Sequence, residues 1–277
     1  MALHMKSLLK RGMVAVALSC CAAISSWAQS DLDAGFAAAN QGDYTSAIKL
    51  WQPLADKGNS NARNNLGVLY EKGWGVARDY AKAGEWYRKA ADQGNASAQN
   101  NLGVLYERGQ GVPQDYRKAV EWYRKAASRG DLNAQNNLGV LYERGQGVSQ
   151  SLDEAIKLYR GAAEKGLAQA QNNLGVFYER GKGVAQDYSQ AAIWYRKAAE
   201  QGNPAAQNNL GVLYGTGRGV TEDVVQANYW FTLAATGGSN NGATNRDNTA
   251  RRLSPAQREQ VEKLLAEWQT RQSARHP

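Results

Sequence analysis

The chain has 277 residues, 43% of them hydrophobic and 21% charged, with 33 basic against 25 acidic side chains. Both cysteines and one of the two histidines lie within the first 28 residues, so the rest of the chain has no thiol and one histidine, His276. This excludes a disulfide framework, a thiol nucleophile and a thiolate metal site from residue 29 on. The charges are interleaved rather than blocked, which indicates a solvated surface and does not favour nucleic acid as a partner.

Residues 1–28 have the pattern of a signal peptide. Lys6, Lys10 and Arg11 precede an apolar stretch from Met13 to Ile24, and small residues at Ser26 and Ala28 place cleavage after Ala28. The apolar stretch is shorter than the roughly 20 residues that a membrane-spanning helix needs. Two alternatives are an uncleaved anchor and lipidation at one of the two cysteines. Cleavage leaves 30 basic residues against 25 acidic ones and predicts a periplasmic or secreted protein.

A five-residue motif, Leu-Gly-Val-Leu-Tyr, recurs every 36 residues without insertion. Its copies begin at Leu66, Leu102, Leu138, Leu174 and Leu210, with Phe177 replacing a leucine in the fourth. An aromatic pair such as Trp122-Tyr123 and a following Ala-Ala pair keep the same spacing, although Leu158 replaces one of the tryptophans. A fixed period predicts a repeat protein, here with five units at 59–94, 95–130, 131–166, 167–202 and 203–238.

Each unit is predicted to form two helices. In 95–130, apolar residues at helical spacing precede Gly109-Gln110-Gly111, which is expected to end the first helix. Asp115 is placed to cap the second helix through its carboxylate. A mid-helix glycine, Gly103 in this unit, costs about 1 kcal/mol relative to alanine, so its recurrence predicts close helix–helix approach. Stacked hairpins complete each other's burial, which predicts a solenoid.

The two ends of the array are predicted to be caps. Residues 29–58 are expected to form an N-terminal helical hairpin, and 239–277 to form C-terminal capping helices and a tail. Ser254, Pro255 and Gln257 have the spacing of a capping box with proline at the first helical position. The helix that follows is expected to pack on the last repeat through Val261 and its apolar neighbours. The stretch from Gly237 to Thr244 is predicted to be a flexible loop.

The repeat pattern resembles that of the Sel1-like repeat, a relative of the tetratricopeptide repeat. The resemblance rests on the Leu-Gly, Gly-x-Gly-Val, Trp-Tyr and Ala-Ala motifs and covers 59–238. It implies an all-α fold, a right-handed α/α superhelical solenoid whose first helices line the concave surface. It also implies an adaptor that binds another protein or peptide. Some relatives are cysteine-rich, with reported penicillin binding or β-lactamase activity, but their cysteines are absent here.

One face of each first helix repeats an asparagine, a valine and an acidic–basic pair away from the packing stripe. The predicted partner-binding residues are Asn64, Val68, Asn100, Val104, Glu107, Arg108, Asn136, Val140, Glu143, Arg144, Asn172, Val176, Arg180 and Asn208. An asparagine amide offers both a donor and an acceptor, so these residues are predicted to bind the backbone of an extended peptide. The other interpretation is an Asn–Asn ladder that is purely structural.

The predicted function is therefore an exported interaction scaffold with no catalytic residues, cofactor or metal, and no membrane span after cleavage. The alternative is an envelope enzyme that acts on β-lactams or cell-wall peptides, like the cysteine-rich relatives. A third is release from the cell to act on a host protein. The Gly-x-Gly turns, the Trp-Tyr pairs and the helix-start aspartates are interpreted as helix ends, core and caps, respectively.

Overall fold

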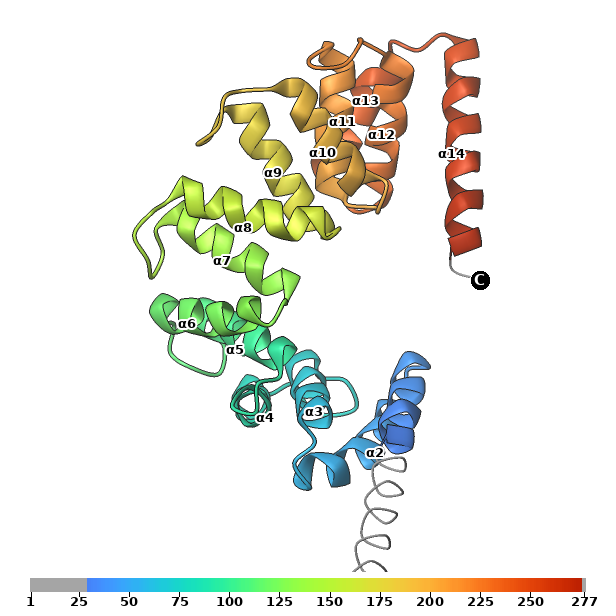
Figure 1. The fold of residues 1–277 in the computed structure, drawn as a ribbon. Coiled ribbons are helices and arrows are strands. Elements are labelled where there is room, and N and C mark those ends of the chain that lie inside the picture. The colour runs from blue at the N-terminus through green and yellow to red at the C-terminus, as the bar shows by residue number, and fades with distance from the viewer. Residues whose placement is uncertain (1–28, 276–277) are drawn as a thin grey trace, which may run out of the picture. The chain divides into compact units, whose positions relative to one another are not determined.

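The computed structural model describes residues 29–275, and all of its regular elements are helices (Figure 1). The predicted signal peptide and His276 lie outside these residues. Residues 29–40 are helical, and α2 covers Tyr44–Asp56. The first helices of the repeats are α3 (Ser60–Lys72), α5 (Ala96–Arg108), α7 (Leu132–Arg144), α9 (Ala168–Arg180) and α11 (Pro204–Thr216). The second helices are α4 (Tyr80–Ala91), α6 (Tyr116–Ser128), α8 (Leu152–Glu164), α10 (Tyr188–Ala199) and α12 (Val224–Thr236). The chain ends with α13 (Asn240–Ala250) and α14 (Pro255–Arg275).

The chain divides into two compact units, one ending at Arg129 and the other beginning at Gly130. In the first unit, α2 packs against α3, α3 against α4, α4 against α5 and α5 against α6. In the second unit, α7 to α13 pack in the same successive way, and α14 packs against α12. Packing between neighbours in chain order is the property that defines a helical repeat array.

Most helices begin at a side chain that caps the free N–H groups of the first turn. Asn95 Oδ1 accepts a hydrogen bond from the Ala98 N–H at 2.9 Å, and Asp115 Oδ1 accepts one from the Lys118 N–H at 3.0 Å. In the third repeat, Ser151 replaces the aspartate and still caps α8. The predicted role of these acidic residues as helix caps is confirmed.

Each first helix ends on a glycine in the left-handed conformation. Gly109 has φ of +66°, and its N–H donates to the Leu105 carbonyl. The second glycine of the same turn, Gly111, has φ of +69°, and a Cβ there would lie 2.3 Å from the Tyr80 carbonyl carbon. The turn therefore packs on the main chain of the preceding repeat, and both glycines of the Gly-x-Gly motif have a structural reason.

The mid-helix glycine of each first helix accommodates an aromatic ring from the second helix of the same repeat. A Cβ on Gly103 would lie 2.6 Å from Tyr123 Cε1. Tyr123 is fully buried, as are its equivalents Tyr87, Tyr159 and Tyr195. Phe231 lies against Gly211 in the same way. The predicted close approach at these glycines is confirmed, and the contact is an aromatic ring against the helix backbone.

The N-terminal hairpin packs through Trp51 of α2. The Trp51 indole N–H donates to the Leu32 carbonyl at 3.2 Å, and Phe36 lies edge-on to the indole at a centroid distance of 5.4 Å. Trp51 and Leu32 belong to a buried cluster that extends to Leu66 and Leu69 of α3. The hairpin is therefore continuous with the core of the first repeat.

The C-terminal end differs from the prediction at one place and matches it at another. The expected flexible loop is wrong from Asn240 on, because α13 begins there, and Ser239 Oγ caps the helix at the Gly242 N–H. The capping box of α14 is confirmed: Ser254 N–H donates to Gln257 Oε1 at 2.9 Å, and Gln257 N–H donates to Ser254 Oγ at 3.3 Å. Val261 is buried against the last repeat, as expected.

Candidate functional site

The predicted partner-binding residues differ in how far they reach the surface. Asn100, Asn136 and Asn172 are 9%, 6% and 6% exposed, so these side chains are buried. The other predicted asparagines, the valines and the glutamates of this set are half-buried, namely Asn64, Asn208, Val68, Val104, Val140, Val176, Glu107 and Glu143. Arg108, Arg144 and Arg180 are exposed. We call the valines and these last-turn cations, with their equivalents Lys72 and Val212, the first-helix face.

Within each unit, the paired asparagines link a first helix to the preceding one through side-chain hydrogen bonds. In the first unit, Asn101 Nδ2 donates to Asn64 Oδ1 at 3.1 Å. In the second unit, the same bond joins Asn173 to Asn136 at 2.9 Å, Asn209 to Asn172 at 3.2 Å and Asn245 to Asn208 at 3.0 Å. We call this series the asparagine ladder. The structural ladder that the sequence left open is present, and contact between these amides and a ligand stays a prediction.

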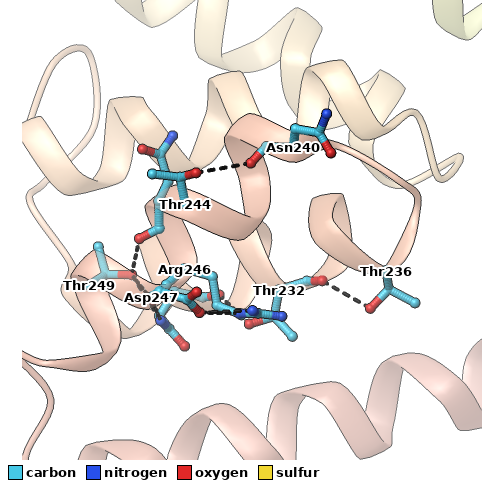
Figure 2. Close-up of polar contacts among 9 residues, drawn as sticks. Thr232, Thr236, Asn240, Thr244, Arg246, Asp247 and Thr249 are labelled. Atoms are coloured by element: carbon cyan, nitrogen blue, oxygen red, sulfur yellow. Dashed lines mark hydrogen bonds and ion pairs between the residues drawn. The ribbon is translucent and has the colours of Figure 1, made fainter.

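The ladder ends at α13, which repeats the register of a first helix in altered form. Asn245 is its last donor, and Thr244 stands where the preceding helices have the acceptor asparagine. The Thr244 hydroxyl instead donates to the Asn240 carbonyl of its own helix at 3.2 Å (Figure 2). Asn228 fixes α13 on α12 by donating to Thr249 Oγ1 and to the Arg246 carbonyl, both at 2.8 Å. At this position α13 therefore has a hydroxyl in place of the amide acceptor that continues the ladder.

A buried phenol holds the glutamate of each of the first four repeats. Tyr87 donates to Glu71 Oε2 at 2.7 Å, Tyr123 to Glu107 at 2.6 Å and Tyr159 to Glu143 at 2.9 Å; Tyr195 makes the same bond to Glu179. Burial, and secondarily the adjacent carboxylate, raise the pKa of Tyr87 above its ordinary value, so the phenol remains a donor. In the fifth repeat Phe231 replaces the tyrosine, and Gly215 replaces the glutamate. Both members of the pair are lost together.

These bonds revise the predicted Glu/Arg surface pairs. Glu107 and Glu143 are bonded to phenols rather than to Arg108 and Arg144, because the phenols reach them from the second helix. Lys182 also forms an ion pair with Glu143 at 2.9 Å, from the turn of the next repeat. Within residues 29–275, Arg108, Arg144 and Arg180 have no carboxylate partner, and Lys72 pairs with Glu71 at 2.9 Å.

Helix α2 contains one serine and one lysine at a spacing that bears on the enzyme alternative. Ser46 and Lys49 have the Ser-x-x-Lys spacing found in some acyl-transfer enzymes. The Ser46 N–H and hydroxyl both bond to Asp43, the N-cap of α2, and these bonds lower the pKa of the Asp43 carboxyl. The serine is therefore part of a helix cap.

Two equivalent cavities on the second-helix side of the second unit were missed by the sequence reasoning. One, of about 410 Å³, is lined by Ile156, Lys157 and Arg160 of α8 with Gly183 and Val184 of the next turn. The other, of about 350 Å³, has Ala192, Ile193, Arg196, Gly219 and Val220 at the positions 36 residues later. Ile193 is 46% exposed there. A cavity that forms between a helix and the turn of the next repeat has no motif of its own in the sequence.

The described residues contain neither a metal-binding cluster nor a membrane-spanning helix. Between residues 29 and 275 there is no group of three or more histidine, cysteine, aspartate or glutamate side chains placed to hold a metal ion. No helix in the same range has the length and apolarity that crossing a membrane requires.

Comparison with known proteins agrees with this architecture. The Sel1 repeat family model matches at 37–59, 60–95, 96–131, 132–167, 168–203 and 204–239. A protective antigen of uropathogenic Escherichia coli, described as displaying an SLR fold, is 44% identical over 82% of this chain with a TM-score of 0.75. This chain spans 49% of that protein's length. A Sel1 repeat protein from Oxalobacter formigenes is 36% identical over 75% of this chain and 83% of its own, with a TM-score of 0.68. No curated protein matches the chain.

The successive helix hairpins, the glycine–aromatic contact in each and the ladder between them define an all-α solenoid repeat protein, the fold class that the sequence predicted. The chain belongs to the Sel1 repeat family. The first family match, at 37–59, falls mostly within the hairpin that the sequence analysis assigned to the N-terminal cap. Sel1 repeat proteins generally serve as scaffolds for protein interactions.

Proposed function

We propose that this chain is an exported interaction scaffold that binds a segment of another protein on its first-helix face. The observation that carries the proposal is the asparagine ladder. In the second unit it holds α7, α9 and α11 in register, so Val140, Val176 and Val212 occupy the same place on consecutive helices. A surface that repeats its chemistry at a fixed spacing suits an extended partner segment.

The chemistry of the face favours a segment with both apolar and acidic side chains. The valines are half-buried and offer apolar area without being fully covered. Arg144 and Arg180 are exposed, and the nearest glutamates are already bonded to phenols. A guanidinium that lacks an internal partner is suited to bidentate contact with a carboxylate. The buried asparagines act as positioning residues in this proposal, and Asn64 and Asn208 are half-buried at the ends of the series.

Export is supported by the sequence of residues 1–28, with its basic start, short apolar stretch and small residues before Gln29. We propose cleavage after Ala28 and a periplasmic location. Fractionation of cells with mass spectrometry of the N-terminus tests this directly. A mature chain that begins at Gln29 in the periplasm is expected, and an intact N-terminus in the cytoplasm would contradict it.

The proposal assigns no reaction to the chain. The enzyme alternative predicts hydrolysis of a chromogenic cephalosporin by purified protein. We expect no turnover above the buffer rate, and a measurable rate that Ser46→Ala abolishes would favour the alternative instead.

In-cell crosslinking tests the proposed face. Photoreactive residues at Val140 and Val176 are expected to capture one and the same partner. Control residues at Glu154 and Lys157, exposed on α8, are expected to capture it at least tenfold less efficiently. Equal capture from both sides, or different proteins at Val140 and Val176, would contradict a specific face.

A further inference from the structure

A cavity of about 410 Å³ lies between the last repeat and the C-terminal helix, within the second unit. Gln226, Tyr229 and Trp230 line it from α12, and Leu264, Trp268, Arg271 and Gln272 line it from α14. Glu200, at the end of α10, completes the wall. None of these residues belongs to the first-helix face, so the cavity is independent of the function proposed above.

The lining contains a buried hydrogen-bond donor without a partner. Trp230 is 4% exposed, and its indole Nε1 has no acceptor among residues 29–275. The buried indole of Trp51 shows the usual arrangement, since its N–H donates to the Leu32 carbonyl. A buried donor that remains unpaired destabilises a fold, and such groups in proteins are few. Because Nε1 is itself buried, an acceptor in the cavity would satisfy Trp230 and remove this penalty after a small displacement of the neighbouring side chains.

The other lining groups restrict the chemistry of that acceptor. Tyr229 and Trp268 pack around Trp230 with ring centroids at 4.8 and 6.1 Å, so much of the wall is aromatic. Arg271 and Glu200 provide charge of both signs, and Gln226 contributes an amide. A balanced charge favours a neutral ligand over an ion. Planar polar side chains next to aromatic rings suit a ligand with a flat apolar face and hydroxyl groups at its edge.

We propose that this cavity is a binding site for a neutral saccharide. An aromatic ring of the wall covers the apolar face of one sugar ring. The Trp230 indole donates to a sugar oxygen, and Arg271 and Gln226 bond to hydroxyl groups at the edge. The site would let the scaffold bind a glycan and a protein on different surfaces.

Nuclear magnetic resonance of the indole N–H groups in the full mature chain tests the proposal. The probes are the trimer of N-acetylglucosamine and cellotriose, and the comparison ligand is an uncharged, end-blocked tripeptide with a central phenylalanine. We expect one or both saccharides to shift the Trp230 Nε1–H resonance and to leave that of Trp51 in place. Trp230→Phe assigns the resonance.

Substitutions of cavity residues test whether the saccharide that shifts the Trp230 resonance binds in the cavity. Arg271→Ala and Gln226→Ala are each expected to weaken saccharide affinity about tenfold, whereas Lys263→Ala, on the exposed side of α14, leaves it unchanged. Circular dichroism confirms that each variant is folded. The absence of a Trp230 shift with either saccharide, a shift with the tripeptide alone, or an equal loss in Lys263→Ala would overturn the proposal.

Discussion

At the scale of single residues, each repeat depends on a small set of contacts between its two helices. The mid-helix glycine admits the aromatic ring, and the glutamate one turn later accepts the hydroxyl of that ring. Both contacts recur in the first four repeats, where the glutamate and the tyrosine are 16 residues apart. The fifth repeat keeps the ring as Phe231 and loses the glutamate, which indicates that the two contacts are separable.

Gly175→Ala tests the ring contact. The new Cβ would lie 2.6 Å from two atoms of the fully buried Tyr195 ring, so overpacking is expected to lower the free energy of unfolding by about 1–3 kcal/mol. Gly161→Ala is the matched control, because its Cβ would meet Gln135 Oε1 at 3.7 Å, which is an ordinary van der Waals contact. We expect this control to be stabilising by up to about 1 kcal/mol. Urea unfolding measures both, and equal effects would show that the glycine has no packing role.

A double-mutant cycle on Tyr195 and Glu179 tests the phenol–carboxylate bond. Tyr195→Phe leaves a half-buried carboxylate without its donor, at an expected cost of about 1–3 kcal/mol. Adding Glu179→Ala is expected to recover part of that loss, because the double variant resembles the native fifth repeat. Urea unfolding of the four proteins gives the coupling energy. Strictly additive effects would mean that the bond contributes nothing.

At the scale of the helix, the asparagine ladder sets the relation between successive first helices within each unit. Its bonds join residues 37 positions apart, and a sequence pattern with a period of 36 does not show which asparagine meets which. The sequence did show that two asparagines recur together, and both a binding and a structural role were consistent with that. The structure adds that Asn100, Asn136 and Asn172 are buried.

A sequence pattern reports contacts between residues that are close along the chain, and it does not report which distant residues meet. Helices, caps and the glycine ends were predictable because they depend on residues close along the chain, such as Asp115 and Gly109. The Glu–Tyr bonds and the cavities form between different elements, so no local pattern reports them. The sequence did contain one indication of the Glu–Tyr bonds, because the fifth repeat replaces the glutamate by Gly215 and the tyrosine by Phe231. The start of α13 was mispredicted because its glycine and asparagines are typical of a loop, whereas packing on α12 stabilises the helix.

Asn173→Ala separates a positioning role from direct binding. It removes the donor to Asn136, and we expect a loss of about 1–2 kcal/mol in the free energy of unfolding. Asn248→Ala, at an exposed position of α13, is the control and should change stability by less than about 0.5 kcal/mol. Unchanged stability of Asn173→Ala together with loss of partner capture would indicate that the asparagines contact the partner directly.

At the scale of the whole molecule, the buried phenols predict how stability depends on pH. The pKa values of Tyr87, Tyr159 and Tyr195 are raised, by burial first and by the adjacent glutamates second. A folded-state pKa above the unfolded one, which is about 10, means that the folded chain holds the proton more tightly. The stabilisation is therefore complete below about pH 10 and declines as the pH rises further. Urea midpoints between neutral and alkaline pH should show this decline, and Tyr195→Phe should lessen it; a flat profile would contradict it.

The same repeat contacts that stabilise the array also fix the face that we propose for binding. Because the ladder and the glycine contacts hold the first helices, the valines and arginines need no rearrangement to meet a partner. A preformed surface of this kind loses little conformational entropy on binding. The function that we propose therefore depends on the register of the repeats rather than on any single reactive group.

The most direct measurement is co-purification of the crosslinked partner with a face variant. The test variant combines Val140→Asp with Val176→Asp and places two acidic side chains on the first-helix face. The control variant combines Lys157→Asp with Ile193→Asp and places two acidic side chains on the second helices α8 and α10. Circular dichroism checks that both variants are folded. We expect the amount of co-purified partner to fall at least tenfold with the test variant and to stay unchanged with the control variant. Retention by the first variant, or equal loss by both, would contradict the proposed face.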